Sequence, residues 1–374
     1  MKTTYLLLCL LGIGSVSGTG QTKQPQKIGD FIESTSYNEH RRNATRSLQY
    51  TPDGDDFVCI NGKNRFTRAL YGSHAAFRLE TSDRPVFAAY TKENPKHICF
   101  KLQTSGGTVA LDSTEHCESR YTAGRRSYSL SDPAFGGGSL SITTWALPDK
   151  EGAIWQFNAR NFKEFHPVLL ASISEIRNSK LNRNGDMGAD PADSFEAPLQ
   201  PQQLQSFPVQ IDGTLYILLE NQELRTLTTA EGENLFKKAE AARSETASRI
   251  RIETPDPYFN TLGGTLAMAA DGIWDGEVWL HGAIGWRMPL SGWRAAYTGD
   301  VLGWHDRART HFNAYAASQV TEVPNTFPHP AQDSALHLAR SVKKWGTPQY
   351  SNGYICRNPH RNNQMHHYDM NLCY

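Results

Sequence analysis

The sequence has no excess of charge of either sign. Its 374 residues include 38 lysine plus arginine and 38 aspartate plus glutamate. Nucleic acids and anionic membranes attract proteins through a basic excess, so this composition favours neither partner. The chain also has no run of about 20 apolar residues of the kind that crosses a bilayer. We therefore expect no nucleic-acid partner and no transmembrane helix.

Cysteine is scarce, and its spacing fits no metal site. Apart from Cys9 there are five cysteines, without a CxxC pair or a Cys/His ligand pattern, so neither a structural zinc nor another cofactor is expected. An odd number leaves at least one thiol unpaired. Buried free thiols are the expectation, with one disulfide among the first three as the alternative. The five are Cys59, Cys99, Cys117, Cys356 and Cys373.

A polar insertion at residues 178–201 carries asparagines and aspartates near the spacing of a calcium loop. The glycine of the sharp turn is displaced and the final bidentate glutamate is absent. Ordinary polar turns are therefore expected there, and no metal site.

The first twenty residues have the composition of a secretory signal. Lys2 precedes the apolar run 5–11, which is too short to span a bilayer and is followed by small residues. Cleavage is expected after Gly18 or Gly20. The mature protein is therefore predicted to be secreted or periplasmic, with no membrane contact after cleavage.

Short alternating segments without intervening helices predict an antiparallel β-sandwich over residues 57–229, after a lead-in at 21–56. Asn61-Gly62 lies between two strand-like runs, 57–60 and 65–71, and predicts a hairpin. The other predicted strands are 76–80, 86–90, 97–102, 108–111, 126–130, 139–146, 154–158, 168–176 and 214–220.

The pattern becomes helical after Leu227. Residues 230–248 predict an exposed helix within a linker at 230–257. Further helices are predicted at 258–273, at 300–319 with Asp300 at its N-terminus, and at 331–345. Because the last helical pattern stops at Tyr374, residues 258–374 are interpreted as part of a larger helical domain in a truncated chain.

Residues 279–311 gather four tryptophans with arginines, carboxylates and a histidine. Aromatic rings stack on sugar rings, guanidinium groups bind hydroxyls, and carboxylates can transfer protons. The stretch therefore predicts a sugar-binding cleft, and a Trp-rich packing loop is the alternative. The side chains expected to bind substrate are Trp286, Arg287, Trp293, Arg294 and His305.

The order of sandwich, linking helix and helical segment resembles the secreted six-hairpin glycosidases of Bacteroidetes, in which the catalytic domain is an α/α toroid. PLSGWRAAYTGD, at 289–300, is similar to the α-L-rhamnosidase signature: Thr298, Gly299 and Asp300 match, while Tyr297 and Arg294 stand at its Trp and Arg positions. Gly292 and Trp293 replace its acidic pair. The resemblance implies a β-sandwich followed by the first helices of such a toroid.

A glycosidase needs two carboxyl groups beside the glycosidic oxygen, and the resemblance implies an inverting, rhamnosidase-like hydrolase of plant cell-wall carbohydrate. Asp300 is the predicted catalytic carboxylate, and the general acid is expected on helices beyond this chain. A non-catalytic carbohydrate-binding or structural module is the alternative. The other candidate carboxylates are Asp271, Asp275, Glu277, Asp306, Glu322, Asp333 and Asp369.

Overall fold

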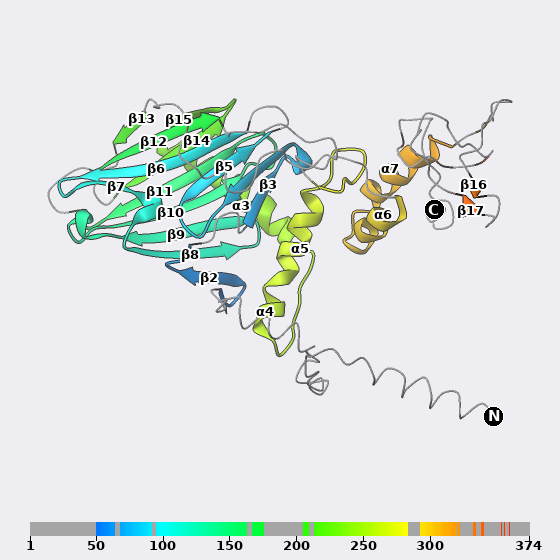
Figure 1. Ribbon diagram of the computed structural model, residues 1–374, viewed down its shortest axis with the longest axis horizontal. Helices are drawn as coiled ribbons and strands as arrows, with labels where there is room; N and C mark the ends of the chain where they lie inside the picture. The colour runs from blue at the N-terminus through cyan, green and yellow to red at the C-terminus, as the bar shows by residue number, and fades with distance from the viewer. Residues whose placement is uncertain are drawn as a thin grey trace. The chain divides into compact units, whose positions relative to one another are not determined.

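Alternation of apolar and polar residues produces two antiparallel sheets that pack face to face (Figure 1). The structure is a computed structural model. It describes residues 50–63, 68–91, 95–162, 167–175, 205–208, 213–282, 292–319 and 321, the pairs 332–333 and 338–339, and positions 353, 355 and 359. Only the backbone is described for 292–294 and for the two pairs. The predicted signal segment and the insertion 178–201 lie outside the described residues.

The first sheet, sheet A, has the spatial order β1-β2-β8-β9-β10-β11-β14-β15. The predicted strands 139–146 and 214–220 match β10 and β14 from end to end. Its strands are β1 (Thr51–Asp53), β2 (Asp56–Ile60), β8 (His116–Thr122), β9 (Arg125–Ser131), β10 (Ser139–Ala146), β11 (Ala153–Arg160), β14 (Thr214–Glu220) and β15 (Glu223–Leu227).

The second sheet, sheet B, has the order β13-β12-β6-β5-β4-β3, with β7 paired to β6. The predicted strand 86–90 matches β5. The strands are β3 (Arg68–Gly72), β4 (Phe77–Thr81), β5 (Val86–Tyr90), β6 (Lys96–Thr104), β7 (Gly107–Ala110), β12 (Val168–Glu175) and β13 (Gln205–Pro208). The 3₁₀ turns η2 (His74–Ala76), η3 (Leu111–Ser113) and η4 (Pro133–Phe135) connect strands.

Large aromatic rings fill the space between the sheets. Phe100 lies 5.0 Å from Phe157 and 5.7 Å from Trp155, ring centre to ring centre, and both contacts are edge-on. Phe87 contacts Trp155 and Tyr128 in the same way, at 5.4 and 6.0 Å. Such contacts contribute about 0.5–1.5 kcal/mol each beyond the area they bury. The predicted antiparallel sandwich is therefore confirmed at the level of two packed sheets.

Asn61-Gly62 does not form the predicted hairpin. β2 pairs with β1 and β8, whereas β3 belongs to sheet B, so the chain crosses between sheets after Asn61. Asn61 does have the left-handed backbone typical of Asn-Gly turns, with φ of 50°. Its backbone N–H, however, donates to the Cys117 carbonyl, and its side-chain Oδ1 accepts from the Cys117 N–H, so Asn61 is joined to the start of β8 instead.

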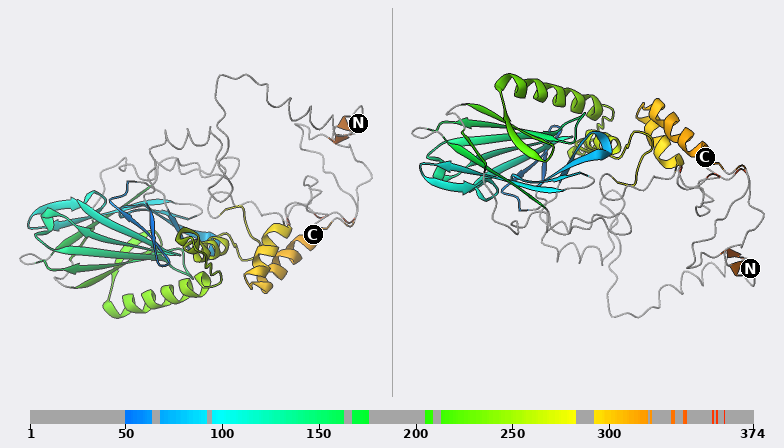
Figure 2. Two further views of the ribbon diagram at one scale, coloured as in Figure 1. Left: turned by 90° about the horizontal axis from the view of Figure 1, so that it is seen from below. Right: turned by 90° about the horizontal axis from the view of Figure 1, so that it is seen from above.

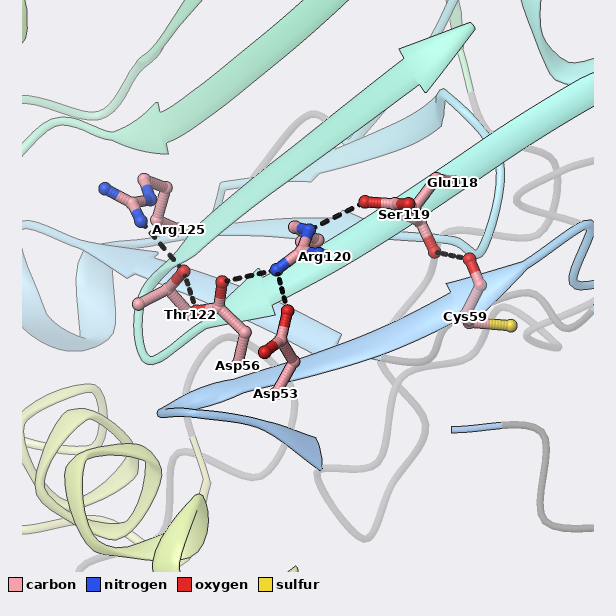
Figure 3. Close-up of polar contacts among 8 residues, drawn as sticks. All are labelled: Asp53, Asp56, Cys59, Glu118, Ser119, Arg120, Thr122 and Arg125. Atoms are coloured by element: carbon pink, nitrogen blue, oxygen red, sulfur yellow. Dashed lines mark hydrogen bonds and ion pairs between the residues drawn. The ribbon is translucent and has the colours of Figure 1, made fainter. Parts of the chain in front are cut away.

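Charge pairs stabilise the outer face of the first strands of sheet A (Figure 3). Arg120 on β8 donates to Asp53 at 2.8 Å and to Glu118 at 2.7 Å. Asp56 on β2 accepts a hydrogen bond of 2.5 Å from Thr122. Hydrogen bonds to Glu118 and Asp53 raise the pKa of Arg120. Because these groups satisfy one another, we interpret the network as structural.

Helix α3 (Thr229–Ala247) confirms the helix predicted at 230–248. It begins with a capping box in which Thr228 and Glu231 exchange hydrogen bonds. It lies along one face of the sandwich, where Phe236 packs against Trp145 and Tyr216 of sheet A (Figure 2). The helix therefore covers part of the outer face of sheet A.

Four shorter helices follow: α4 (Pro257–Asn260), α5 (Leu262–Asp271), α6 (Gly292–Val301) and α7 (His305–Ala316). The single helix predicted at 300–319 is wrong, because the chain turns between α6 and α7 at Gly303, whose φ is 75°. The helix predicted at 331–345 is also wrong where it is described, since β16 (Gln332–Asp333) and β17 (Leu338–Ala339) pair there. No described helix is long and apolar enough to cross a membrane.

Candidate functional site

A polar cavity of about 190 Å³ lies where sheets and helices meet. We call it the junction cavity. The turn after β3, the end of β10, the second half of α3, the end of α5 and the start of α7 contribute to its lining. The polar and aromatic residues that line it are Tyr71, Ser73, His74, Trp145, Arg243, Glu245, Thr246, Arg249, Asp271, Trp304 and Arg307.

The turn that carries Ser73 and His74 is held in an unusual backbone conformation. Both residues have left-handed φ angles, 51° and 55°. This conformation costs about 1–3 kcal/mol for each residue that is not glycine. Two contacts hold the turn in place. The amide of Ala75 donates to the carbonyl of Trp274 at 2.8 Å, and Ala75 is buried with Tyr315 of α7. The helices thus fix the loop that presents His74 to the cavity.

Asp271, the last residue of α5, is the central acceptor of the cavity. Its Oδ1 atom accepts hydrogen bonds from Nδ1 of His74 at 3.1 Å and from Nη1 of Arg307 at 2.7 Å. Burial alone would raise the pKa of this carboxyl group. The hydrogen bonds from His74 and Arg307 and the electrostatic attraction of these two groups outweigh burial, so the pKa is lowered. Asp271 is therefore a carboxylate at neutral pH.

Trp304 positions two guanidinium groups at the cavity wall. The guanidinium carbon of Arg307 lies 4.5 Å from the centre of a Trp304 ring, and that of Arg249 lies 5.2 Å away. Arg249 also donates to the carbonyl of Leu302 at 2.9 Å. Since only 7% of Trp304 is exposed, its role here is to orient the arginines.

Ser73 adds a hydroxyl group to the same wall. Its Oγ atom is buried and has no hydrogen-bond partner within the part of the chain that the structure describes. A buried hydroxyl without a partner costs free energy, which a bound water or ligand recovers. The junction cavity therefore offers a hydroxyl, a carboxylate, an imidazole and guanidinium donors to one ligand.

A larger groove of about 700 Å³ borders the opposite side of α3. Arg243 lines both spaces, and it is fixed by bonds to the Ala123 carbonyl at 2.9 Å and to Glu240 at 2.6 and 2.8 Å. Burial would raise the pKa of Glu240, but Arg243 and the indole of Trp145 lower it. Arg243, paired with Glu240, therefore lies between the junction cavity and the larger groove.

Of the sequence-predicted site residues, Asp300 and His305 have described side chains, and neither lines the junction cavity. Asp300 and His305 form a pair, with Oδ1 and Nδ1 2.5 Å apart, and each side chain is 65% exposed. Asp300 lies in the last turn of α6 and not at the predicted helix N-terminus, so the helix dipole does not favour its charge. Trp286 and Arg287 lie outside the described residues. The backbone of Trp293 and Arg294 lies in the first turn of α6.

Sequence reasoning identified Asp271 only as one of several carboxylates, and it missed His74, Arg249 and Arg307. His74 and Asp271 are 197 positions apart, so no local spacing connects them. Among the described residues, no three His, Cys, Asp or Glu side chains lie close enough together to hold a metal ion.

Comparison with known proteins gives one partial match. A family model described as "Domain of unknown function (DUF4450)" matches residues 95–249, which run from the start of β6 to just beyond α3. No curated protein matches the chain. The matched segment includes Arg243 and Arg249 but neither His74 nor Asp271, so it contributes only one wall of the junction cavity.

Proposed function

We propose that this protein binds a carbohydrate at the junction cavity. The observation that carries the proposal is that the ionised Asp271 contacts the imidazole of His74 and the guanidinium of Arg307, while the guanidinium of Arg249 lines the same cavity. Sugar hydroxyls both donate and accept hydrogen bonds, so they match such a mixed wall. Polar groups that converge on a small cavity are also the usual form of a small-molecule site.

Charge-assisted bonds to hydroxyl groups would give this site its selectivity. Asp271 accepts from hydroxyls, and Arg249 and Arg307 donate to them. The free hydroxyl of Ser73 fits a neutral ligand that brings both a donor and an acceptor. In the proposed setting, a secreted protein would meet such ligands as plant cell-wall oligosaccharides.

Calorimetric titration of the full chain with rhamnose-containing and xylan-derived oligosaccharides tests the proposal. Ser73→Ala should weaken binding about 5-fold, since it removes one hydrogen bond and disturbs no existing one. Arg307→Gln should weaken it about 10-fold or more. Arg309→Gln is the matched control, because Arg309 lies one half-turn away on the same helix and is 70% exposed. Equal affinity of all three variants and the parent would refute binding at this cavity.

Hydrolysis is a second candidate function, favoured by the presence of two carboxyl groups, Asp271 and Glu245, at one cavity. An ionised Asp271 suits a base or nucleophile. Glu245, whose side chain is 77% exposed, is the candidate partner. In this proposal α4–α7 are the first helices of a rhamnosidase-like α/α toroid. Release of reducing sugar that is lost in Asp271→Asn would support hydrolysis, whereas binding without release would support recognition alone.

A further inference from the structure

A third space, a cleft of about 380 Å³, lies on the sandwich beside the connection between β4 and β5. It shares no described lining residue with the junction cavity. We call it the turn cleft. Its lining combines two cations, one carboxylate, three hydroxyls and one apolar side chain: Lys63, Arg84, Asp112, Ser82, Ser113, Thr114 and Val86.

Ser82 is, with Thr114, one of the two most buried polar residues that line the turn cleft. The residue is only 1% exposed, and its Oγ atom has no hydrogen-bond partner among the described residues. Its backbone is fixed, because its carbonyl accepts from Nη2 of Arg126 at 2.9 Å and from the hydroxyl of Tyr128 at 2.8 Å. A hydroxyl held rigidly at a cleft wall without a partner is the feature expected where a ligand or water completes the bonding.

The residue after Ser82 stabilises this geometry from inside the sandwich. Asp83 is fully buried, its Oδ1 atom lies 3.5 Å from Nη2 of Arg126, and it accepts a hydrogen bond from the hydroxyl of Tyr50. Both members of the ion pair are at most 1% exposed. Removing either would leave an uncompensated buried charge, so this pair holds the turn rigidly.

Arg84 brings a positive charge whose bonds are to neutral groups. Its Nε atom donates to the Gly62 carbonyl at 3.0 Å, Nη1 to the Thr114 carbonyl at 2.6 Å and Nη2 to Oδ1 of Asn61 at 3.4 Å. A guanidinium has five N–H donors, so two remain for a ligand. These anchoring bonds fix the side chain in one geometry, which reduces the entropy lost when it binds an anion.

We infer that the turn cleft binds a small hydroxylated carboxylate, of the size and chemistry of a uronic acid unit. Lys63 and Arg84 against Asp112 leave one net positive charge, which matches a single carboxylate better than a doubly charged phosphate. Asp112 accepts hydrogen bonds from ligand hydroxyls, and the three hydroxyl groups of the cleft can both accept and donate. Val86 provides an apolar contact for the carbon skeleton.

Calorimetric titration of the full chain with D-galacturonate, D-galactose and inorganic phosphate tests this inference. Galacturonate should bind at least 10-fold more tightly than galactose, which lacks the charge, or phosphate, which lacks the carbon skeleton. Added salt should weaken galacturonate binding, because Lys63 is exposed. Absence of galacturonate binding, or equal binding of galactose or of phosphate, would overturn the inference.

Variants separate this cleft from other sites. Ser82→Ala should weaken galacturonate binding about 5-fold and Lys63→Gln about 3-fold, without lowering the unfolding midpoint. Lys237→Gln, at an exposed lysine of α3 that lines neither cavity, should have no effect. If Ser73→Ala lowers galacturonate affinity and Ser82→Ala does not, the uronate binds in the junction cavity, and the inference fails while the proposed function stands.

Discussion

His74 and Asp271 are 197 positions apart in the chain, yet their side chains lie 3.1 Å apart. One belongs to the turn that leaves sheet B and the other ends helix α5. Because Arg307 of α7 donates to the same carboxylate oxygen, a single atom of Asp271 joins three parts of the chain. The candidate site therefore exists only when the sandwich and these helices are docked.

Replacing Asp271 with asparagine should destabilise the protein. The change removes a carboxylate that is 15% exposed and leaves Arg307 beside a neutral group. We expect a loss of about 2 kcal/mol in the free energy of unfolding, measured by urea titration at pH 7. Asp306→Asn is the matched control, since Asp306 is 94% exposed and should change stability little.

The same variant should also change the acid dependence of stability. Because the folded-state pKa of Asp271 is lowered, its contribution is complete above the unfolded pKa of about 3.9. It is lost as pH falls through the folded pKa. The parent protein should therefore be more stable than Asp271→Asn at neutral pH, and this difference in unfolding free energy should disappear below about pH 4. An unfolding free-energy difference that stays constant from pH 7 to pH 3 would contradict the lowered pKa.

Asp300→Asn should leave stability unchanged within about 0.5 kcal/mol, because exposed ion pairs contribute little. Its partner His305 is equally exposed, and neither residue lines the junction cavity. Oligosaccharide affinity should also be unchanged. Strong loss of binding or turnover in this variant, with an unchanged unfolding midpoint, would instead establish Asp300 as part of the site.

Gly232→Ala should destabilise α3 on the sandwich despite the better helix propensity of alanine. A Cβ atom at Gly232 would lie 2.2 Å from Cγ of Tyr216, so the helix or the ring must move. Propensity gains about 1 kcal/mol and overpacking costs about 1–3 kcal/mol. A lower unfolding midpoint is expected. Asn234→Ala, at an exposed position of the same helix, should raise it slightly.

Cys117 should resist alkylation in the folded protein. Burial raises the pKa of its thiol to about 12, so roughly one molecule in 10,000 carries the thiolate at pH 8. Peptide mapping after iodoacetamide treatment should show Cys99, which is less buried, modified before Cys117. Both should react readily in urea. Rapid labelling of Cys117 without denaturant would show that the sandwich opens locally.

The strands were predictable because their residues alternate, and alternation is a local property of the sequence. In β10, small polar residues such as Ser141 alternate with buried ones such as Ile142. The sequence alone therefore indicates which side chains point into the core. The hairpin predicted at Asn61 was wrong. The Asn-Gly dipeptide indicates a left-handed backbone, but it does not determine which strands pair on either side of it. Pairing depends on residues far along the chain.

The candidate site could not be predicted for the same reason. The sequence draws attention to 279–311 because its tryptophans and charges are dense. Trp304 proved to be a buried support for arginines, and Asp300 proved to be exposed. His74 gave no signal, since a single histidine after a strand has no distinctive spacing. Only the docking of η2 against α5 and α7 gives it a role.

The left-handed turn at Ser73 and His74 makes ligand occupancy and helix docking thermodynamically linked. Its backbone strain is opposed by the Ala75–Trp274 hydrogen bond and by burial of Ala75 against Tyr315. A ligand that contacts His74, Asp271 and Arg307 together binds the protein only when the helices are docked on the sandwich. Because such coupling is reciprocal, the ligand stabilises helix docking by the same factor by which docking increases the ligand's affinity. Saturating ligand should therefore slow proteolysis at residues 250–257, which follow α3 and do not line the junction cavity.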